Sequence, residues 1–296
     1  MTKNNSNDSM FYEILVRIFT MLNVADLVVA SMVCKSWNLA CRAPELWRKL
    51  DLRSLSLRSL SVPLSPHAWI DEQSSNTMTQ FLKYATSLSG ENISCVIFNY
   101  CVYLRDVHLI SIAERTPNLK RLVLPMSGEI SKNGLEIAMR SWRCLESITI
   151  TTSIYDFKFF DAIGKHCKNI TSLKFACFFG QEEAESLVKY TPNLKFLSFR
   201  DMPINHRALC RVLNSLEHLD VVNLCHTDII DYGLKLYSSH RNLLNRMNIS
   251  CKIITCEKRS CLMCKNESTN DPTRQPSGIL EEIRNWREDE IDSLAH

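Results

Sequence analysis

The sequence is short of several features that would indicate a particular class of protein. Only seven of its 296 residues are glycine, which disfavours an open α/β sheet with glycine-rich turns between its strands and helices. Its apolar runs fall well short of the ~18 residues that cross a bilayer, so we expect no membrane-spanning segment. The net charge of +3 and the scattered basic residues predict binding neither to nucleic acid nor to a membrane surface.

Motifs for catalysis and cofactor binding are also missing. The sequence contains none of the patterns HExxH, GxxxxGKS, GxxxxGKT, GxGxxG or GxSxG, and its eight histidines show no clustering typical of metal ligands. We therefore expect a protein that is not an enzyme, holds no cofactor and acts by binding other proteins.

The thirteen cysteines are an odd number, and the first ten residues, MTKNNSNDSM, lack the apolar core of a signal peptide. Both observations favour free thiols in a reducing compartment over a disulfide framework. We expect the protein in the nucleus, the cytoplasm or both.

Residues 10–52 predict a cluster of three or four short helices. Asn23 is a candidate N-cap for the second helix, and Pro44 is placed to open the last one. So small a unit buries too little surface to be stable alone, so it should pack on the following chain or on a partner. The first helix carries one apolar stripe, formed by Ile14, Leu15, Ile18, Phe19 and Leu22.

In order and spacing, this segment resembles an F-box, from Glu13-Ile14-Leu15 through Val33-Cys34-Lys35-x-Trp37 to Pro44-x-Leu46-Trp47 and Leu50-Asp51-Leu52. The F-box is the helical module by which target receptors dock on the Skp-type adaptor of SCF ubiquitin ligases. This segment departs from the F-box pattern at its start, where Met10-Phe11 replaces the usual Leu-Pro, and Phe11 cannot supply the fixed φ of proline. The resemblance implies adaptor contacts by Met10, Phe11, Ile14, Leu15, Ile18, Phe19, Leu22, Leu27, Val33, Cys34 and Trp37.

After residue 90 the sequence repeats itself. Six lines, of which PNLKRLVL and PNLKFLSF are examples, carry apolar residues at positions i, i+3 and i+5. Such spacing predicts a short strand with one buried face, and a helical pattern lies between successive lines. The lines begin at Ile93, Leu119, Leu145, Ile170, Leu194 and Leu216, which are 26, 26, 25, 24 and 22 residues apart.

A strand and a helix in each unit of that length are typical of a leucine-rich repeat (LRR), whose units bury their apolar faces against one another. Residues 47–52 fit the same phase, so the last part of the F-box is also a candidate first strand. With the F-box, the repeats resemble the plant-type F-box/LRR family over nearly the whole chain. The predicted fold is α/β: a short all-α F-box and an open LRR solenoid with parallel strands on its concave face and helices on its convex face.

The predicted organisation is a disordered N-terminus (1–9), the F-box (10–52), one or two irregular repeats (53–90), leucine-rich repeats (91–250) and a tail (251–296). Strand positions between the buried ones should face the concave side, where basic and aromatic groups would suit an acidic or phosphorylated peptide, although they could equally form a solvated face. The candidate target-binding residues are Arg121, Val123, Thr149, Lys174, Phe196, Arg200, His218 and Asp220.

The tail contains four cysteines, Cys251, Cys256, Cys261 and Cys264. They could hold tetrahedral zinc, remain free thiols in a capping segment or form a disulfide, and the compartment favours free thiols. Residues 250–256 read partly as one more strand, and residues 279–294 have an amphipathic pattern that could cap the solenoid or form an acidic partner helix.

The resemblance implies a substrate receptor of an SCF ubiquitin ligase, with the F-box on a Skp-type adaptor, which brings cullin and a RING protein, and the repeats on an unknown protein substrate. Two other hypotheses remain. One is a non-enzymatic LRR scaffold whose F-box-like start only caps the solenoid, and the other is a zinc-dependent binding module led by the tail.

Overall fold

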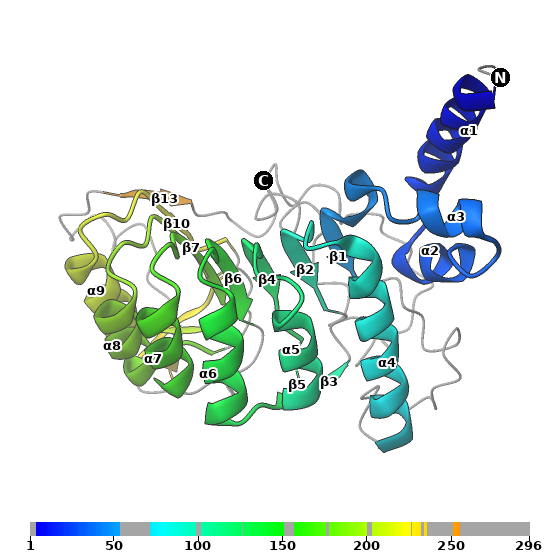
Figure 1. The fold of residues 1–296 in the computed structure, drawn as a ribbon. Helices are drawn as coiled ribbons and strands as arrows, with labels where there is room; N and C mark the ends of the chain where they lie inside the picture. Colours follow the sequence, from blue (N-terminus) through cyan, green and yellow to red (C-terminus); the bar gives the residue numbers. More distant parts are fainter. Residues whose placement is uncertain are drawn as a thin grey trace, which may run out of the picture. The chain divides into compact units, whose positions relative to one another are not determined.

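A computed structural model describes residues 4–53, 72–98, 102–125, 127–150, 157–175, 178–199, 203–225, 227–231, 234–235 and 251–254. The chain divides into two compact units, residues 1–145 and 146–296. Within each unit the helices that alternate with the parallel strands lie on one side of them (Figure 1). Across the described ranges, every helix is too short or too polar to span a bilayer.

Unit 1 begins with the predicted cluster of short helices. The Asn23 side chain accepts hydrogen bonds from the backbone N–H groups of Ala25 and Asp26, so it is the N-cap that the sequence predicted. Pro44 opens the last helix, also as predicted. The elements are α1 (Asn4–Phe19), α2 (Val24–Ala30), α3 (Lys35–Ala40) and the 3-10 helix η1 (Pro44–Trp47).

Helix α1 is longer than the sequence predicted. Disorder was expected up to residue 9, but the helix already begins at Asn4. No proline or glycine lies between Asn4 and Phe19, so no residue in this stretch interrupts the backbone hydrogen bonds. The start of the predicted F-box at residue 10 therefore lies inside a continuous helix.

The parallel strands of unit 1 follow the helical cluster directly. Lys49 lies opposite Cys95, and Cys95 lies opposite Arg121, which places residues 47–52 in phase with the repeats and confirms that prediction. A second, short parallel pair joins β3 (Tyr103–Arg105) to β5 (Ser127–Glu129). The main strands are β1 (Lys49–Asp51), β2 (Cys95–Ile97) and β4 (Arg121–Val123), with helices α4 (Glu72–Ser89), α5 (Asp106–Ala113) and α6 (Lys132–Ser141).

Unit 2 continues the same pattern, with its main strands in the order β6-β7-β8-β10-β13. The main strands are β6 (Ser147–Ile150), β7 (Ser172–Phe175), β8 (Phe196–Ser198), β10 (Val221–Asn223) and β13 (Lys252–Ile254), with helices α7 (Phe157–His166), α8 (Gln181–Tyr190) and α9 (His206–Ser215). A smaller sheet contains β9 (Ile204–Asn205), β11 (Ile229–Asp231) and β12 (Leu234–Lys235). The fold is thus mixed α/β, with N-terminal helices followed by an LRR-like arrangement.

The register of β10 corrects the last predicted repeat. Val221 lies opposite Phe196, so the residue equivalent to Leu194 is Leu219 and not Leu216. The sequence was misleading because Leu216, Leu219 and Val221 happen to show the same i, i+3, i+5 spacing. The correction makes the last interval 25 residues, close to the others, and β13 is a further strand within residues 250–256, where the sequence predicted one in part.

The cores consist of the predicted apolar positions together with aromatic side chains. Leu119, Leu122 and Leu124 are buried, as the repeat predicts. In unit 2, the Phe175 and Phe199 rings are stacked with centroids 5.6 Å apart, and the Phe179 ring contacts both. Each repeat thus buries its side chains against those of its neighbours, as expected of a solenoid.

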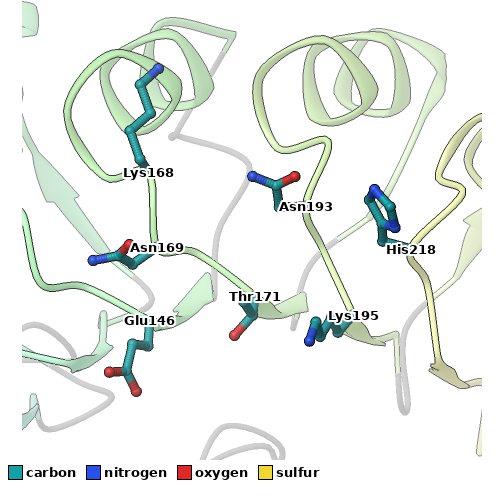
Figure 2. A pocket seen from close by; sticks show the side chains of 7 residues that line it. All are labelled: Glu146, Lys168, Asn169, Thr171, Asn193, Lys195 and His218. Carbon is teal, nitrogen blue, oxygen red and sulfur yellow. The ribbon is translucent and has the colours of Figure 1, made fainter.

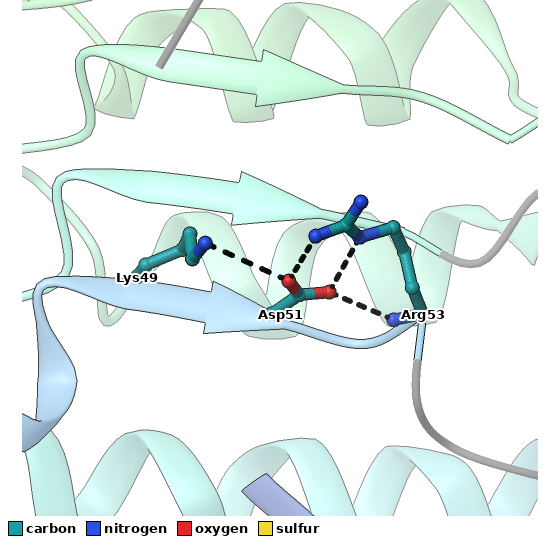
Figure 3. A network of polar contacts seen from close by, with 3 residues as sticks. All are labelled: Lys49, Asp51 and Arg53. Atoms are coloured by element: carbon teal, nitrogen blue, oxygen red, sulfur yellow. Dashed lines mark hydrogen bonds and ion pairs between the residues drawn. The ribbon is translucent and has the colours of Figure 1, made fainter. Parts of the chain in front are cut away.

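The first strand carries a charged network on the side away from the helices (Figure 3). The Arg53 guanidinium donates two hydrogen bonds to the Asp51 carboxylate, at 2.7 and 3.0 Å, and the Lys49 ammonium lies 3.8 Å from it. Burial alone would raise the pKa of Asp51, but the hydrogen bonds and positive charge of Arg53, with Lys49, together lower it. The carboxylate therefore stays ionised and holds the chain that leaves β1.

His108 in α5 is fully buried and should make the stability of unit 1 depend on pH. Its Nδ1 accepts the backbone N–H of Arg105 at 3.2 Å, so Nε2 carries the hydrogen, 3.0 Å from Ser75 Oγ. Burial lowers the pKa of His108, and the Arg105 charge lowers it further, against a raising effect of the Ser75 backbone bond. The unfolded chain therefore binds a proton near pH 6.5 that the folded unit rejects, so stability is full above that pH and falls as the pH drops.

We expect the wild type to lose about 1 kcal/mol of unfolding free energy between pH 7.5 and 5.5, in excess of any loss in His108→Gln. Urea unfolding at both pH values measures the difference. His218→Gln, at an exposed histidine, is the control and should keep the wild-type pH dependence. An identical pH dependence in wild type and His108→Gln would contradict the prediction.

Candidate functional site

Exposed apolar side chains are concentrated in the N-terminal helices. Nine of the eleven large hydrophobic residues that are exposed in the described part of the chain lie between Met10 and Leu39. Contiguous exposed apolar surface on a folded protein usually marks a site where a partner binds. The nine are Met10, Phe11, Ile14, Ile18, Met21, Val29, Met32, Val33 and Leu39.

Helix α1 is apolar on two sides, which explains why part of it is exposed. Leu15 and Phe19, spaced i and i+4, face the core of unit 1 and are 5% and 2% exposed. Ile14 and Ile18, one residue earlier, are 49% and 51% exposed. We call Met10, Phe11, Ile14 and Ile18 the outer stripe of α1, since their spacing places them together on one side of the helix. One apolar side of α1 is thus buried in the core of unit 1, and the other is exposed.

The entry of the predicted F-box differs from the usual Leu-Pro in a way that the structure explains. Phe11 is 54% exposed and lies within α1, whose backbone continues from Asn4 to Phe19. Phenylalanine has a backbone N–H that can join the helical hydrogen bonds, whereas proline has none. Met10 and Phe11 thus add a further turn to the outer stripe.

The predicted adaptor contacts fall into two groups. Met10, Phe11, Ile14, Ile18, Val33 and Cys34 are exposed, and Leu22 and Trp37 are half-buried. Leu15, Phe19 and Leu27 are instead buried, and Phe19 packs edge-on against Trp37 at 5.3 Å between ring centroids. These three cannot contact a partner directly, because they form the core that holds the exposed residues in place.

Four residues of the exposed set were not predicted from the sequence: Met21, Val29, Met32 and Leu39. In α2 the buried residues are Val24, Leu27, Val28 and Ala30, so Val29 lies off the buried side. An apolar residue outside the buried side of a helix was a signal in the sequence that Val29 is exposed. The signal could not be used because the end of α2 could not be placed from the sequence.

The helical cluster is attached to the first repeat through α4. Ser31 Oγ lies 3.0 Å from Tyr84 Oη, and Arg42 donates to the backbone carbonyl of Ser87 at 3.2 Å. Trp47 is 1% exposed, and its Nε1 donates to the Cys41 carbonyl at 2.6 Å. The helices that carry the exposed set and the first strand of the solenoid therefore form one packed body within unit 1.

The predicted concave-face residues do not form one exposed surface. Arg121 and Phe196 are half-buried, but Val123, Thr149 and Lys174 are buried, with Lys174 only 6% exposed. The prediction of an accessible row was wrong at these three positions. In unit 2, Thr149, Lys174 and Ser198 lie side by side in adjacent strands, and neighbours about 4.8 Å apart shield one another from water.

His218 and Asp220 are exposed but do not lie on the strand face. They precede β10, in the turn and extended segment after α9, because the repeat starts at Leu219. The strand positions that replace them are Val221 and Asn223. Arg200 lies outside the described residues.

The cysteines that the structure describes are free thiols, and several of them are buried. Burial raises the pKa of Cys41 and Cys95 to about 11 and that of Cys167 to about 12. Of the four candidate zinc ligands, Cys251 precedes β13 as a free thiol, and Cys256, Cys261 and Cys264 lie outside the described residues. Within the ranges that the structure covers, no group of three or more His, Cys, Asp or Glu side chains is placed to hold a metal.

Comparison with known proteins identifies the helical cluster and the chain as a whole. A profile of the family F-box-like matches residues 12–53. The chain is 32% identical over 295 aligned residues to F-box/LRR-repeat protein At3g48880 of Arabidopsis thaliana, covering 95% of this chain and 94% of that protein. F-box protein At4g11580 from the same plant is 27% identical with the same coverage, and F-box protein SKIP19 is 24% identical over 65% of this chain and 60% of its own length.

Proposed function

The chain belongs to the F-box/LRR-repeat proteins, and from that premise we propose that it is the target-recognition subunit of a Skp-cullin-F-box ubiquitin ligase. The observation that carries this proposal is the exposed apolar set between Met10 and Leu39, which lies within and beside the residues matched as F-box-like. Such a set is costly in water and is stabilised when a partner with a complementary apolar groove covers it.

In this proposal the protein has no catalytic step of its own. The outer stripe of α1 and the exposed residues of α2 and α3 dock on a Skp-type adaptor, which brings cullin and a RING protein. The repeats bind a target protein and hold it for ubiquitin transfer and degradation by the proteasome. The proposed place of action is the nucleus, the cytoplasm or both.

The packing of unit 1 supports this division of work. Because Trp47 and α4 join the docking helices to the first repeat, a target bound to that repeat would be held at a fixed distance from the adaptor. Transfer between two bound proteins depends on such positioning, since holding the reactants together replaces a bimolecular encounter.

The test is co-expression of the full chain with a plant Skp-type adaptor, followed by affinity purification on the adaptor and size-exclusion chromatography. We expect a complex of one copy of each that remains associated through the column. The Arabidopsis relative At3g48880 is the matched comparison. A chain that is folded by circular dichroism but elutes apart from the adaptor would contradict the proposal and favour a scaffold outside the ligase.

A further inference from the structure

One pentapeptide occurs twice in the chain and is used in two different ways. The sequence Thr-Pro-Asn-Leu-Lys stands at 116–120 in unit 1 and at 191–195 in unit 2. In both copies it forms the turn from a helix to the following strand, and its threonine hydroxyl donates to a carbonyl of the preceding helix, at 2.9 and 2.7 Å. Identical residues in equivalent positions allow a direct comparison of the remaining side chains.

In the first copy the asparagine has a structural partner. The Asn118 side-chain amide donates to the Glu91 carbonyl, 3.3 Å away in the preceding turn. Trp142 Nε1 also donates to Thr116 Oγ1, at 2.9 Å. This copy ties neighbouring turns of unit 1 together.

In the second copy, Asn193 and Lys195 instead line a hollow of about 570 Å³ (Figure 2). Thr171 and His218 line it as well. Asn193 and His218 occupy equivalent positions in successive turns, and Thr171 and Lys195 occupy equivalent positions just before β7 and β8. None of these four side chains has a hydrogen-bond or ion-pair partner among the described residues.

The three other residues of the hollow are Glu146, Lys168 and Asn169. The Lys168 ammonium donates to the Gly164 carbonyl in α7, so its charge is held at that helix and away from Asn193. Glu146 occupies the equivalent position just before β6, next to Thr171, and Figure 2 shows its carboxylate directed toward the same edge of the hollow as the Thr171 hydroxyl and the Lys195 ammonium. The hollow is therefore lined by two ammonium groups and one carboxylate, and by amide, hydroxyl and imidazole groups that can donate hydrogen bonds.

We propose that this hollow binds a phosphoserine or phosphothreonine on a segment of a partner polypeptide. A phosphate monoester carries ≈ −1.5 to −2 charges and three acceptor oxygens, which suits a hollow with more cationic than anionic groups and with donors from several residues. No arginine lines the hollow, so an anion there would be bound by lysine, which is a common phosphate ligand, and by neutral donors. Its open, polar wall fits an extended peptide better than an enclosed apolar small molecule.

The idea that a ligase target binds at this site rests on the proposed function, but the binding assay does not. The immobilised full chain is offered three otherwise identical degenerate peptide libraries, whose fixed central residue is phosphoserine, serine or glutamate. We expect the phosphoserine library to be retained at least fivefold over the serine library and over the glutamate library. Lys195→Glu and Asn193→Ala should bring these ratios close to one.

The internal duplicate supplies the matched control. Lys120→Glu makes the same charge change at the equivalent position of the first copy, and it should retain the wild-type preference. Circular dichroism melting should be unchanged in Lys195→Glu, because Lys195 is exposed. Equal retention of the three libraries by wild type, equal retention of phosphoserine and glutamate, or an equal loss in Lys120→Glu and Lys195→Glu would each overturn the assignment.

Co-purification with the adaptor separates this inference from the proposed function. A wild type that binds the adaptor but shows no phosphoserine preference refutes the hollow alone. A wild type that shows the preference but ignores the adaptor supports the hollow and refutes the ligase role alone.

Discussion

Ile14→Asp combined with Ile18→Asp should weaken binding to a Skp-type adaptor roughly hundredfold or more, with little change in the stability of the chain. Both side chains are about half exposed on the outer stripe of α1, so the folded chain can hydrate the two carboxylates. In a complex the same carboxylates would be buried in an apolar interface without partners, which is costly.

Biolayer interferometry with immobilised adaptor measures the affinity, and urea unfolding measures stability. The matched control is Val107→Asp, which introduces the same charge at another exposed apolar residue outside the helical cluster. Leu15→Asp is unsuitable, because Leu15 is buried and a charge there would unfold the cluster. Retained adaptor affinity in the double variant would show that the outer stripe does not dock.

Trp47→Ala should destabilise unit 1 by about 3–5 kcal/mol, the usual range for truncating a fully buried tryptophan. The indole is 1% exposed and its Nε1 donates to the Cys41 carbonyl, so the change leaves a cavity and an unpaired carbonyl. Because Trp47 links the helical cluster to β1, we also expect a loss of adaptor binding.

Trp47→Phe is the intermediate case, since it keeps an aromatic ring in the core, leaves a smaller cavity and removes the same hydrogen bond. It should cost much less than Trp47→Ala. Urea unfolding followed by circular dichroism measures both variants. A destabilisation below about 1 kcal/mol in Trp47→Ala would show that the helical cluster and the first repeat are not joined through this residue.

Periodicity predicted the repeating part of the fold well, because each repeat places the same buried positions in the same phase. Residues 47–52 could be recognised as a strand on that basis alone. The last repeat failed because Leu216 and Leu219 both satisfy the apolar spacing, and only the pairing of Val221 with Phe196 distinguishes them. The start of α1 at Asn4 was missed because polar composition resembles that of a disordered tail.

The candidate site was predicted less completely, since exposure depends on which side of an element packs. Ile14, Leu15, Ile18 and Phe19 read as one apolar stripe, and the sequence cannot tell which pair forms the core. The sequence places Lys174 at a strand position that was expected to face water, so its burial between the neighbouring strands could not be predicted. Asn118 and Asn193 show the limit most clearly, because identical local sequences have different surroundings.

Helix α4 has a consequence for how such a receptor can be divided. It contacts the helical cluster through Tyr84 and Ser87, and its side chains Met78 and Leu82 are fully buried in the core of unit 1. A fragment that ended at Arg53 would keep every residue matched as F-box-like and still lose the helix against which α2 and η1 pack. We therefore expect the smallest fragment that can be transplanted into a chimaera to be residues 4–98, which include the helix that supports the cluster.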